Sequence, residues 1–330
     1  MHRAGSIAVF SSAALAASQP SSTGRFTFGW TNGAGERWTH AAVVERPDAA
    51  LDNGHAVALF SGGYTADLDW TVPGSYTLRG QTTRLTLSGD DYTDGATLSD
   101  ALTAAGFTVL RYSAIREGDP LHAENRVNAQ TRPIEETYGL ARTALRAMTE
   151  RAGIPIGRTF VLGHSFGANR AAVVAEGAAG YVLLAGAYMS PTSAAPDRLA
   201  ASATAEGRDF DGGGTVSGWE RAAQQRLDGG IVRQGEVFRA AKDGTPEVPW
   251  ASDRLLATGA PVLAVWGGLD DISMHGPLLE RLRPATDTVY FPGFNHQLGE
   301  ERGGLTGPIA TEVVELIVGW LGERVGRGDR

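Results

Sequence analysis

The segment from Arg158 to Ala172, RTFVLGHSFGANRAA, decides the fold predicted for this chain. An apolar run over residues 159–162 leads into a turn of small residues and then into an Ala-rich segment, the pattern of a buried strand followed by a helix. The turn, GHSFG over residues 163–167, is a G-x-S-x-G sequence in the strand-to-helix context that gives it meaning. So tight a reversal strains Ser165 and leaves it beside the N–H groups of a helix start. We therefore interpret Ser165 as a candidate nucleophile.

Glycine is common in this chain, with 44 among 330 residues, so the five letters alone could arise by chance. The alternative interpretation is a phosphate-binding glycine loop or a plain strand-to-helix turn with an idle serine. The strand and helix patterns on either side favour the nucleophile.

The composition, 42% hydrophobic and 20% charged, predicts a folded chain with a full core, either one large α/β domain with an insertion or two domains. The formal net charge of −8 and the pI near 5.4 argue against nucleic acid and anionic membrane surfaces as partners. Because the chain has no cysteine, disulfides, thiolate metal sites and a cysteine nucleophile are excluded together.

Residues 1–18, MHRAGSIAVFSSAALAAS, have the organisation of a signal peptide: an early basic residue, a short apolar run and an A-x-A-type cleavage signal at residues 14–16. The run is too short to span a bilayer, so we expect export to the periplasm or medium without stable membrane insertion. The alternative is an unstructured N-terminus on a cytoplasmic enzyme. Residues 19–24, QPSSTG, are typical of a linker.

Beyond the linker, strand and helix patterns alternate. A β-hairpin is predicted over residues 25–46, with its turn at NGAG, residues 32–35. Further strands are expected over residues 55–60, 107–112, 159–162, 181–185, 261–266 and 288–291, and helices over 96–105, 134–152, 168–176 and 309–325. The alternation predicts a mostly parallel, doubly wound sheet whose ligands lie at the carboxyl ends of the strands. Residues 192–258 interrupt the pattern as a helical cap insertion between core segments 25–191 and 259–330.

The strand at residues 55–60 ends in a glycine-rich loop, SGGYTADLD over residues 61–69. If its strand lies parallel and adjacent to the strand before Ser165, this loop reaches the same edge of the sheet. We expect an oxyanion hole there, made by the backbone N–H groups of Gly63 and of Phe166, the residue after the nucleophile. An ordinary glycine turn is the alternative, and Asp67 and Asp69 are expected to hold the loop through hydrogen bonds to its backbone.

Two later strand ends supply an acid and a base. Residues 267–271, GGLDD, follow one strand, and we prefer Asp270 to Asp271 because it is the residue reached after a tight turn. His296 lies in PGFNH after the last strand, within a Gly and Pro turn. A serine needs an imidazole to remove its proton, and the imidazole needs a carboxylate to orient it. Other histidines fit less well: His40 in a strand, His122 in an early loop, His164 as packing or pocket lining, and His275 too close to the acid.

These motifs resemble the α/β-hydrolase superfamily over residues 25–325, in particular bacterial serine esterases and acyl hydrolases. In that branch the oxyanion loop reads S-G-S-G-x-x-D-R-D and the histidine lies in P-G-L-N-H-L; here the segments are SGGYTADLD and PGFNHQL. The branch's G-x-x-D motif matches residues 267–270, which supports Asp270. Residues 113–118, SAIREG, depart from the usual D-K-R-G-type loop, and the insertion after Pro191 has no fixed counterpart.

The sequence thus predicts an exported serine hydrolase that cleaves a carboxylic ester of a small-molecule substrate and needs no cofactor for catalysis. A peptidase or thioesterase with the same apparatus is the first alternative, because the apparatus does not choose the leaving group. A non-catalytic binding domain of this fold is the alternative from another class.

The cap contains a further motif, DFDGGGTVSGWE over residues 209–220, with the spacing of an EF-hand loop. The oxygen ligands would be those of Asp209, Asp211, Thr215 (through its carbonyl), Ser217 (through water) and Glu220. Gly213 stands where an acidic or amide side chain is usual, which predicts weak binding. We expect a structural calcium site, with a metal-free acidic loop as the alternative.

Overall fold

The computed structural model describes residues 22–62, 65–78, 81–120, 134–186, 251–270, 279 and 283–328. Several predicted features lie outside these residues: the signal peptide at 1–18, Gly63, most of the cap at 192–258 and its calcium loop at 209–220. Among the residues that are described, no helix is both long enough and apolar enough to cross a membrane.

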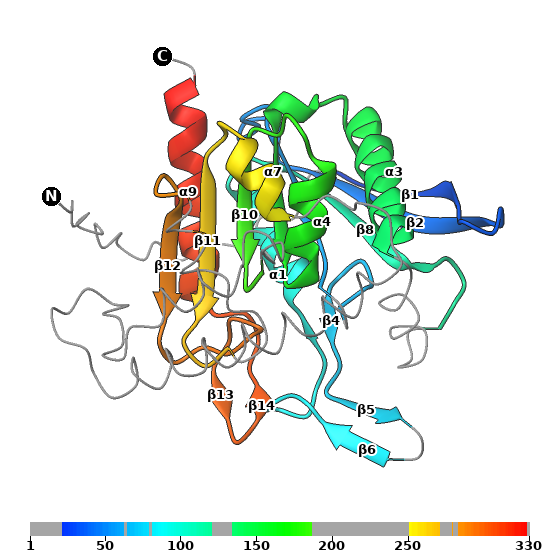
Figure 1. Ribbon diagram of the computed structural model, residues 1–330, viewed down its shortest axis with the longest axis vertical. Helices are drawn as coiled ribbons and strands as arrows, with labels where there is room; N and C mark the ends of the chain where they lie inside the picture. The colour runs from blue at the N-terminus through cyan, green and yellow to red at the C-terminus, as the bar shows by residue number, and fades with distance from the viewer. Residues whose placement is uncertain are drawn as a thin grey trace, which may run out of the picture.

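An eight-stranded sheet forms the centre of the molecule, in the order β1-β2-β8-β3-β9-β10-β11-β12 (Figure 1). From β8 to β12 all neighbours pair in parallel, whereas β2 runs antiparallel to both β1 and β8. The mostly parallel sheet and the N-terminal hairpin are therefore confirmed. The strand bounds are β1 Ser22–Thr31, β2 Arg37–Arg46, β3 Ala56–Phe60, β8 Thr108–Arg116, β9 Thr159–His164, β10 Gly180–Leu184, β11 Val262–Gly267 and β12 Asp287–Phe291.

Helices cover both faces of this sheet. One core contains side chains of α3, α4 and α7, and the other contains side chains of α1 and α9. Successive residues of β3 alternate between the two cores, as Ala58 and Leu59 do, because neighbouring side chains of a strand point to opposite faces. Burial on both faces explains the continuous apolar runs in the sequence. The bounds are α1 Asp94–Ala104, α3 Ile134–Ala152, a 3₁₀ turn Ile156–Arg158, α4 Phe166–Val174, α7 Ala251–Ala257 and α9 Thr311–Gly328.

Two predicted boundaries need correction. Helix α7 falls inside residues 192–258, predicted as cap, yet Ala251 and Leu255 are fully buried in the core that contains α4. The core therefore resumes by residue 251, because this short helix has an apolar side that the sheet layer covers. At the other end, β1 begins at Ser22, inside the predicted linker at 19–24, because the hairpin partner extends to Arg46 and pairs with it.

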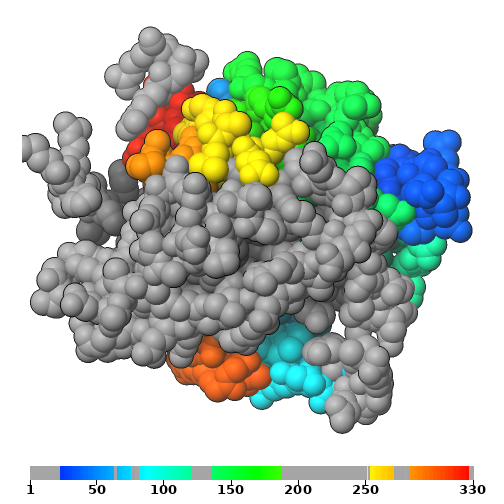
Figure 2. Space-filling view, in the orientation of Figure 1, coloured from blue at the N-terminus to red at the C-terminus, as the bar shows by residue number. Residues whose placement is uncertain are grey.

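The parallel strands end toward the side of the molecule where short antiparallel pairs lie (Figure 1). Figure 2 shows the segments around β5–β6 and β13–β14 next to each other at that end, and a bridge between Thr86 and Thr306 joins them. The short strands are β4 Thr71–Val72, β5 Ser75–Leu78, β6 Gln81–Arg84, β7 Tyr92–Thr93, β13 Glu301–Arg302 and β14 Leu305–Thr306. The loops that follow β3, β9, β11 and β12 consequently meet at one edge of the sheet.

Candidate active site

The turn between β9 and α4 holds Ser165 in a backbone conformation that L-residues rarely adopt, with φ 54° and ψ −126°. The glycines on either side of it are required because no side chain fits at their positions. A Cβ on Gly163 would lie 2.3 Å from the carbonyl oxygen of Gly167, and a Cβ on Gly167 would lie 2.0 Å from that of Phe60. The sharp turn predicted from the sequence is therefore present, and it places Ser165 directly before the first residue of α4, Phe166.

Ser165, His296 and Asp270 form a hydrogen-bonded row. The Nε2 atom of His296 lies 2.8 Å from the Oγ atom of Ser165. Its Nδ1 atom lies 3.0 Å from each carboxylate oxygen of Asp270. Asp270 is 2% exposed and Ser165 is 8% exposed, so the row is shielded from bulk water. The structure thus brings together the three side chains that the sequence selected from separate strand ends.

Backbone strain gathers around this row. Besides Ser165, the described residues contain three non-glycine residues with positive φ: Trp70 (54°), Ala185 (45°) and Leu298 (58°). Ala185 follows β10, whose last residue accepts a 2.8 Å hydrogen bond from the Ser165 N–H, and Leu298 is two residues after His296. Such conformations persist only where the surroundings enforce them, and they are common at functional sites.

The loops that carry the acid and the histidine are joined through their backbones. The N–H of Leu269 donates a 2.9 Å hydrogen bond to the carbonyl oxygen of Phe294. A Cβ on Gly267 would lie 2.2 Å from the same oxygen, so only glycine allows the two loops to come this close. The side chains of Asp270 and His296 are therefore positioned by one rigid backbone unit.

His164 supports His296 from behind. Its Nε2 atom lies 2.8 Å from the carbonyl oxygen of His296, so the ring donates from Nε2, and the two rings are 5.1 Å apart between centroids. Burial, and to a smaller extent the charge of His296, lowers the pKa of His164 from 6.5 to about 4. His164 is therefore neutral at pH 7. The sequence assigned it only to packing or pocket lining, and the hydrogen bond to His296 was missed because residue type does not reveal it.

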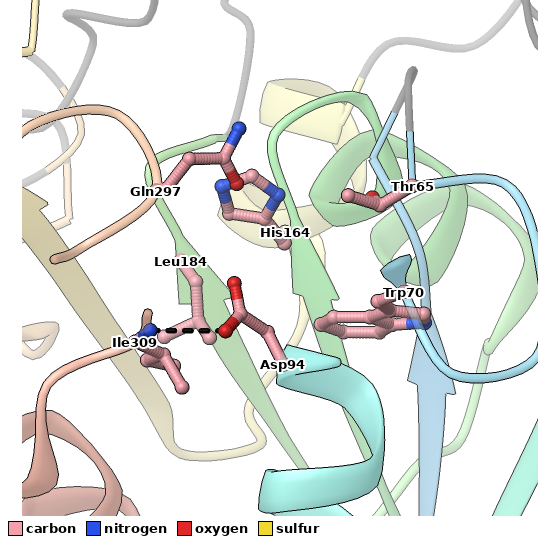
Figure 3. Close-up of a pocket in the computed structure, with 7 residues that line it drawn as sticks. All are labelled: Thr65, Trp70, Asp94, His164, Leu184, Gln297 and Ile309. Atoms are coloured by element: carbon pink, nitrogen blue, oxygen red, sulfur yellow. Dashed lines mark hydrogen bonds between the residues drawn. The ribbon is translucent and has the colours of Figure 1, made fainter. Parts of the chain in front are cut away.

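A small cavity lies beneath His164 (Figure 3). Its volume of about 10 Å³ is room for one water molecule. Figure 3 shows the Asp94 carboxyl pointing toward His164 across this cavity. The Asp94 carboxyl accepts a 3.0 Å hydrogen bond from the Ile309 N–H, while burial raises its pKa from 3.8 to about 6. The cavity is lined by Thr65, Trp70, Asp94, His164, Leu184, Gln297 and Ile309.

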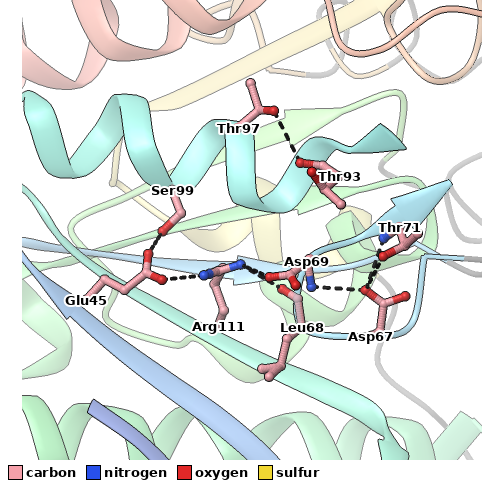
Figure 4. A network of polar contacts seen from close by, with 9 residues as sticks. All are labelled: Glu45, Asp67, Leu68, Asp69, Thr71, Thr93, Thr97, Ser99 and Arg111. Atoms are coloured by element: carbon pink, nitrogen blue, oxygen red, sulfur yellow. Dashed lines mark hydrogen bonds and ion pairs between the residues drawn. The ribbon is translucent and has the colours of Figure 1, made fainter. Parts of the chain in front are cut away.

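The loop after β3 is fixed by its own aspartate, as expected. The Oδ1 atom of Asp67 accepts hydrogen bonds from the N–H groups of Asp69 and Thr71, both at 3.0 Å, and from the Thr71 hydroxyl at 3.1 Å. This side chain is 4% exposed. The loop therefore has a defined shape from Asp67 to Thr71 (Figure 4).

An ionic network centred on the buried Arg111 holds the same loop to the sheet (Figure 4). Arg111 of β8, 6% exposed, pairs with Asp69 at 2.5 Å and with Glu45 of β2, and donates a 3.2 Å hydrogen bond to the carbonyl oxygen of Leu68. Glu45 also accepts a hydrogen bond from Ser99 of α1. The sequence did not reveal this network, because its members are far apart along the chain and the pattern of β8 predicts only an apolar strand.

Several candidate residues lie outside the described residues: Gly63, Asp271, His122, His275 and the calcium loop at 209–220. Within the described part of the chain, His, Asp and Glu side chains form no group of three or more that could hold a metal ion. His40, assigned a structural role, is fully buried, and its Nδ1 atom lies 3.2 Å from the carbonyl oxygens of Ser113 and Ile115.

No protein-family model and no curated protein sequence matches this chain. Solved structures do. The chain is similar to a brefeldin A esterase described as a bacterial homologue of human hormone-sensitive lipase, at 14% identity and TM-score 0.50, over 92% of this chain and 77% of that one. It is also similar to the esterase domain of a Rhodothermus marinus protein, at 18% identity and TM-score 0.48, over 92% and 100%. A proline iminopeptidase from Mycobacterium smegmatis matches at 17% identity and TM-score 0.47, over 91% and 100%. The sheet topology and the match to the brefeldin A esterase show that the chain has the α/β-hydrolase fold.

Proposed function

We propose that this protein is a serine hydrolase that cleaves carboxylic esters through an acyl-enzyme intermediate. The observation that supports this most strongly is the buried row from Asp270 through His296 to the strained Ser165. A serine hydroxyl becomes a useful nucleophile only when an imidazole takes its proton, and the imidazole needs a carboxylate to fix its tautomer. The row has both contacts within hydrogen-bond distance.

In the proposed reaction the Oγ atom of Ser165 attacks the acyl carbon while the Nε2 atom of His296 takes its proton. Asp270 accepts the hydrogen bond from Nδ1–H and stabilises the imidazolium. The backbone N–H groups of Phe166 and Gly63 are the proposed donors to the oxyanion. His296 then gives its proton to the departing alcohol. A water molecule, deprotonated by His296, attacks the acyl carbon, and Ser165 regains its proton as the carboxylic acid leaves.

The environment of His296 suits this cycle. Because His164 is neutral at pH 7, its ring adds no positive charge beside the imidazolium that forms during attack. The hydrogen bond from His164 to the carbonyl oxygen of His296 also holds the main chain of the base in place.

The proposed substrate is a small-molecule acyl ester, with no nucleic acid partner and no cofactor in the chemical steps. The calcium ion predicted in the cap would be structural, and the predicted export stays a proposal.

A fluorophosphonate probe followed by mass spectrometry tests the nucleophile, with the adduct expected on Ser165. A panel of acyl esters, aminoacyl amides and acyl thioesters then tests the leaving group, and esters are expected to turn over fastest. Faster amide or thioester turnover would replace the esterase with the peptidase or thioesterase alternative. Absence of both labelling and turnover would instead favour a binding domain.

A further inference from the structure

Arg170 is a buried cation in helix α4, only 2% exposed. Its Nη1 atom donates a 3.0 Å hydrogen bond to the carbonyl oxygen of Ser61, and its Nε atom has no hydrogen-bond partner among the described residues. Burying a guanidinium is costly unless its contacts compensate for lost hydration. The contacts of Arg170 are therefore expected to have a structural role beside the active site.

Two contacts of Arg170 lie on different segments beside Ser165. Ser61 is the first residue after β3, where the predicted oxyanion loop begins. Phe166 is the first residue of α4, and the Arg170 guanidinium lies 5.1 Å from the centroid of its ring. Residues four apart lie on the same side of a helix, which lets Arg170 reach back over the helix start.

The end of β3 and the start of α4 are already in backbone contact. A Cβ on Gly167 would lie 2.0 Å from the carbonyl oxygen of Phe60 and 2.5 Å from that of Ser61. A Cβ on Gly62 would lie 3.2 Å from the Cβ of Ser165, so the loop passes directly beside the candidate nucleophile. No side chain fits at residue 167. Arg170, one helical turn after it, donates a hydrogen bond from α4 to the segment after β3.

We propose that Arg170 is a positioning residue that holds Ser61 and Gly62 against Ser165 and Phe166, and so sets the geometry in which the oxyanion is stabilised. The inference rests on the proposed function, because it concerns the transition state of acyl transfer. Arg170 itself does not touch the reacting atoms. It acts by fixing the distance between two backbone segments, and stabilisation of an oxyanion depends steeply on the placement of its donors.

The test compares Arg170→Met with Arg283→Met. Methionine keeps the length of the side chain and its helix propensity but removes the donors. Arg283 is the control, because it also donates to backbone, to the carbonyl oxygen of the partly buried Ala260 at 2.6 Å, but at the amino end of β11. We expect kcat of Arg170→Met to fall about 10²-fold with KM within about twofold, as for a small misplacement of catalytic groups. Arg283→Met is expected to lower Tm while kcat stays unchanged.

A boronic acid inhibitor, which forms a tetrahedral adduct with a serine nucleophile, gives a second readout. A loss of stability alone would not change its Ki. Its Ki should rise in parallel with the loss of kcat in Arg170→Met, whereas the Ki of the carboxylate product should stay the same. Arg170→Lys keeps one donor and should recover part of the loss; it also replaces the Met variant in the comparison if that variant does not fold.

Unchanged kcat in Arg170→Met, or an equal loss in Arg283→Met, would overturn the inference while leaving the proposed function intact. A parent protein that neither reacts with fluorophosphonate nor turns over any acyl substrate would refute the proposed function, and this inference with it.

Discussion

Asp94 and His164, which both line the small cavity, should give this protein an unusual dependence of stability on pH. A single substitution of Asp94 exposes it. Asp94 has its pKa raised to about 6 by burial, so the folded protein keeps a proton that the unfolded chain releases above pH 3.8. The stability contributed by Asp94 is complete below that value and is lost as the pH rises through about 6. At 1.36 kcal/mol per pKa unit, the loss is about 3 kcal/mol.

His164 acts in the opposite direction. Its pKa is lowered from 6.5 to about 4, so the unfolded chain takes up a proton before the folded protein does. Its contribution is complete above pH 6.5 and is lost as the pH falls through about 4, again by about 3 kcal/mol. Between pH 4 and 6 the two contributions therefore change in opposite senses and nearly cancel in the parent protein.

Asp94→Asn removes the Asp94 contribution to the pH dependence of stability. The amide oxygen can still accept the hydrogen bond from Ile309, and only the His164 contribution then remains. The free energy of unfolding of the variant should increase relative to the parent by about 2 kcal/mol between pH 4.5 and 7, because part of the Asp94 contribution is already lost at pH 4.5. Urea unfolding followed by tryptophan fluorescence at several pH values measures this difference. Asp52→Asn, at an exposed turn, is the control for replacing a carboxylate by an amide. A variant-minus-parent difference that does not change with pH would refute the reasoning.

Two further predictions concern the acid and the cap. Asp270→Asn should lower kcat by about 10⁴-fold, because the orienting carboxylate fixes the histidine tautomer, while Asp271→Asn should change it little; equal steady-state rates for the two variants would show that the acid is wrongly assigned. Millimolar calcium should raise Tm relative to chelator, by the equivalent of about 2.7 kcal/mol at a hundred times the dissociation constant, and Glu220→Gln should abolish the rise. An unchanged melting curve together with no calorimetric binding would leave the cap loop as a chance match.

The parts of this fold that could be predicted from sequence are those that local chemistry dictates. The apolar run before Ser165, bounded by a glycine turn, predicts a buried strand, and the glycines at 163 and 167 are needed because backbone atoms approach within van der Waals contact there. The strand ends that carry Asp270 and His296 were found the same way, because each follows an apolar run and a glycine turn.

What the sequence did not reveal depends on partners distant in the chain. The hydrogen bond from Arg170 to Ser61 spans 109 residues, and that between Asp94 and Ile309 spans 215. The sequence held one indication of the hydrogen bond from Arg170, since Arg170 is a lone cation within the Ala-rich segment ANRAAVV. Only the structure shows that this side chain is buried. Helix α7 was assigned to the cap because seven residues carry too little periodic pattern to indicate which layer buries them.

The most direct test of the account is the reaction of the purified protein and its Ser165→Ala variant with a fluorophosphonate and an acyl ester. The parent should form one covalent adduct, on Ser165, and hydrolyse the ester. The variant should form no adduct and lose about 10⁶-fold in kcat while its Tm and circular dichroism stay close to those of the parent. Ester turnover near the parent rate in the variant, or a parent adduct on any other residue, would contradict the assignment of Ser165 as the nucleophile.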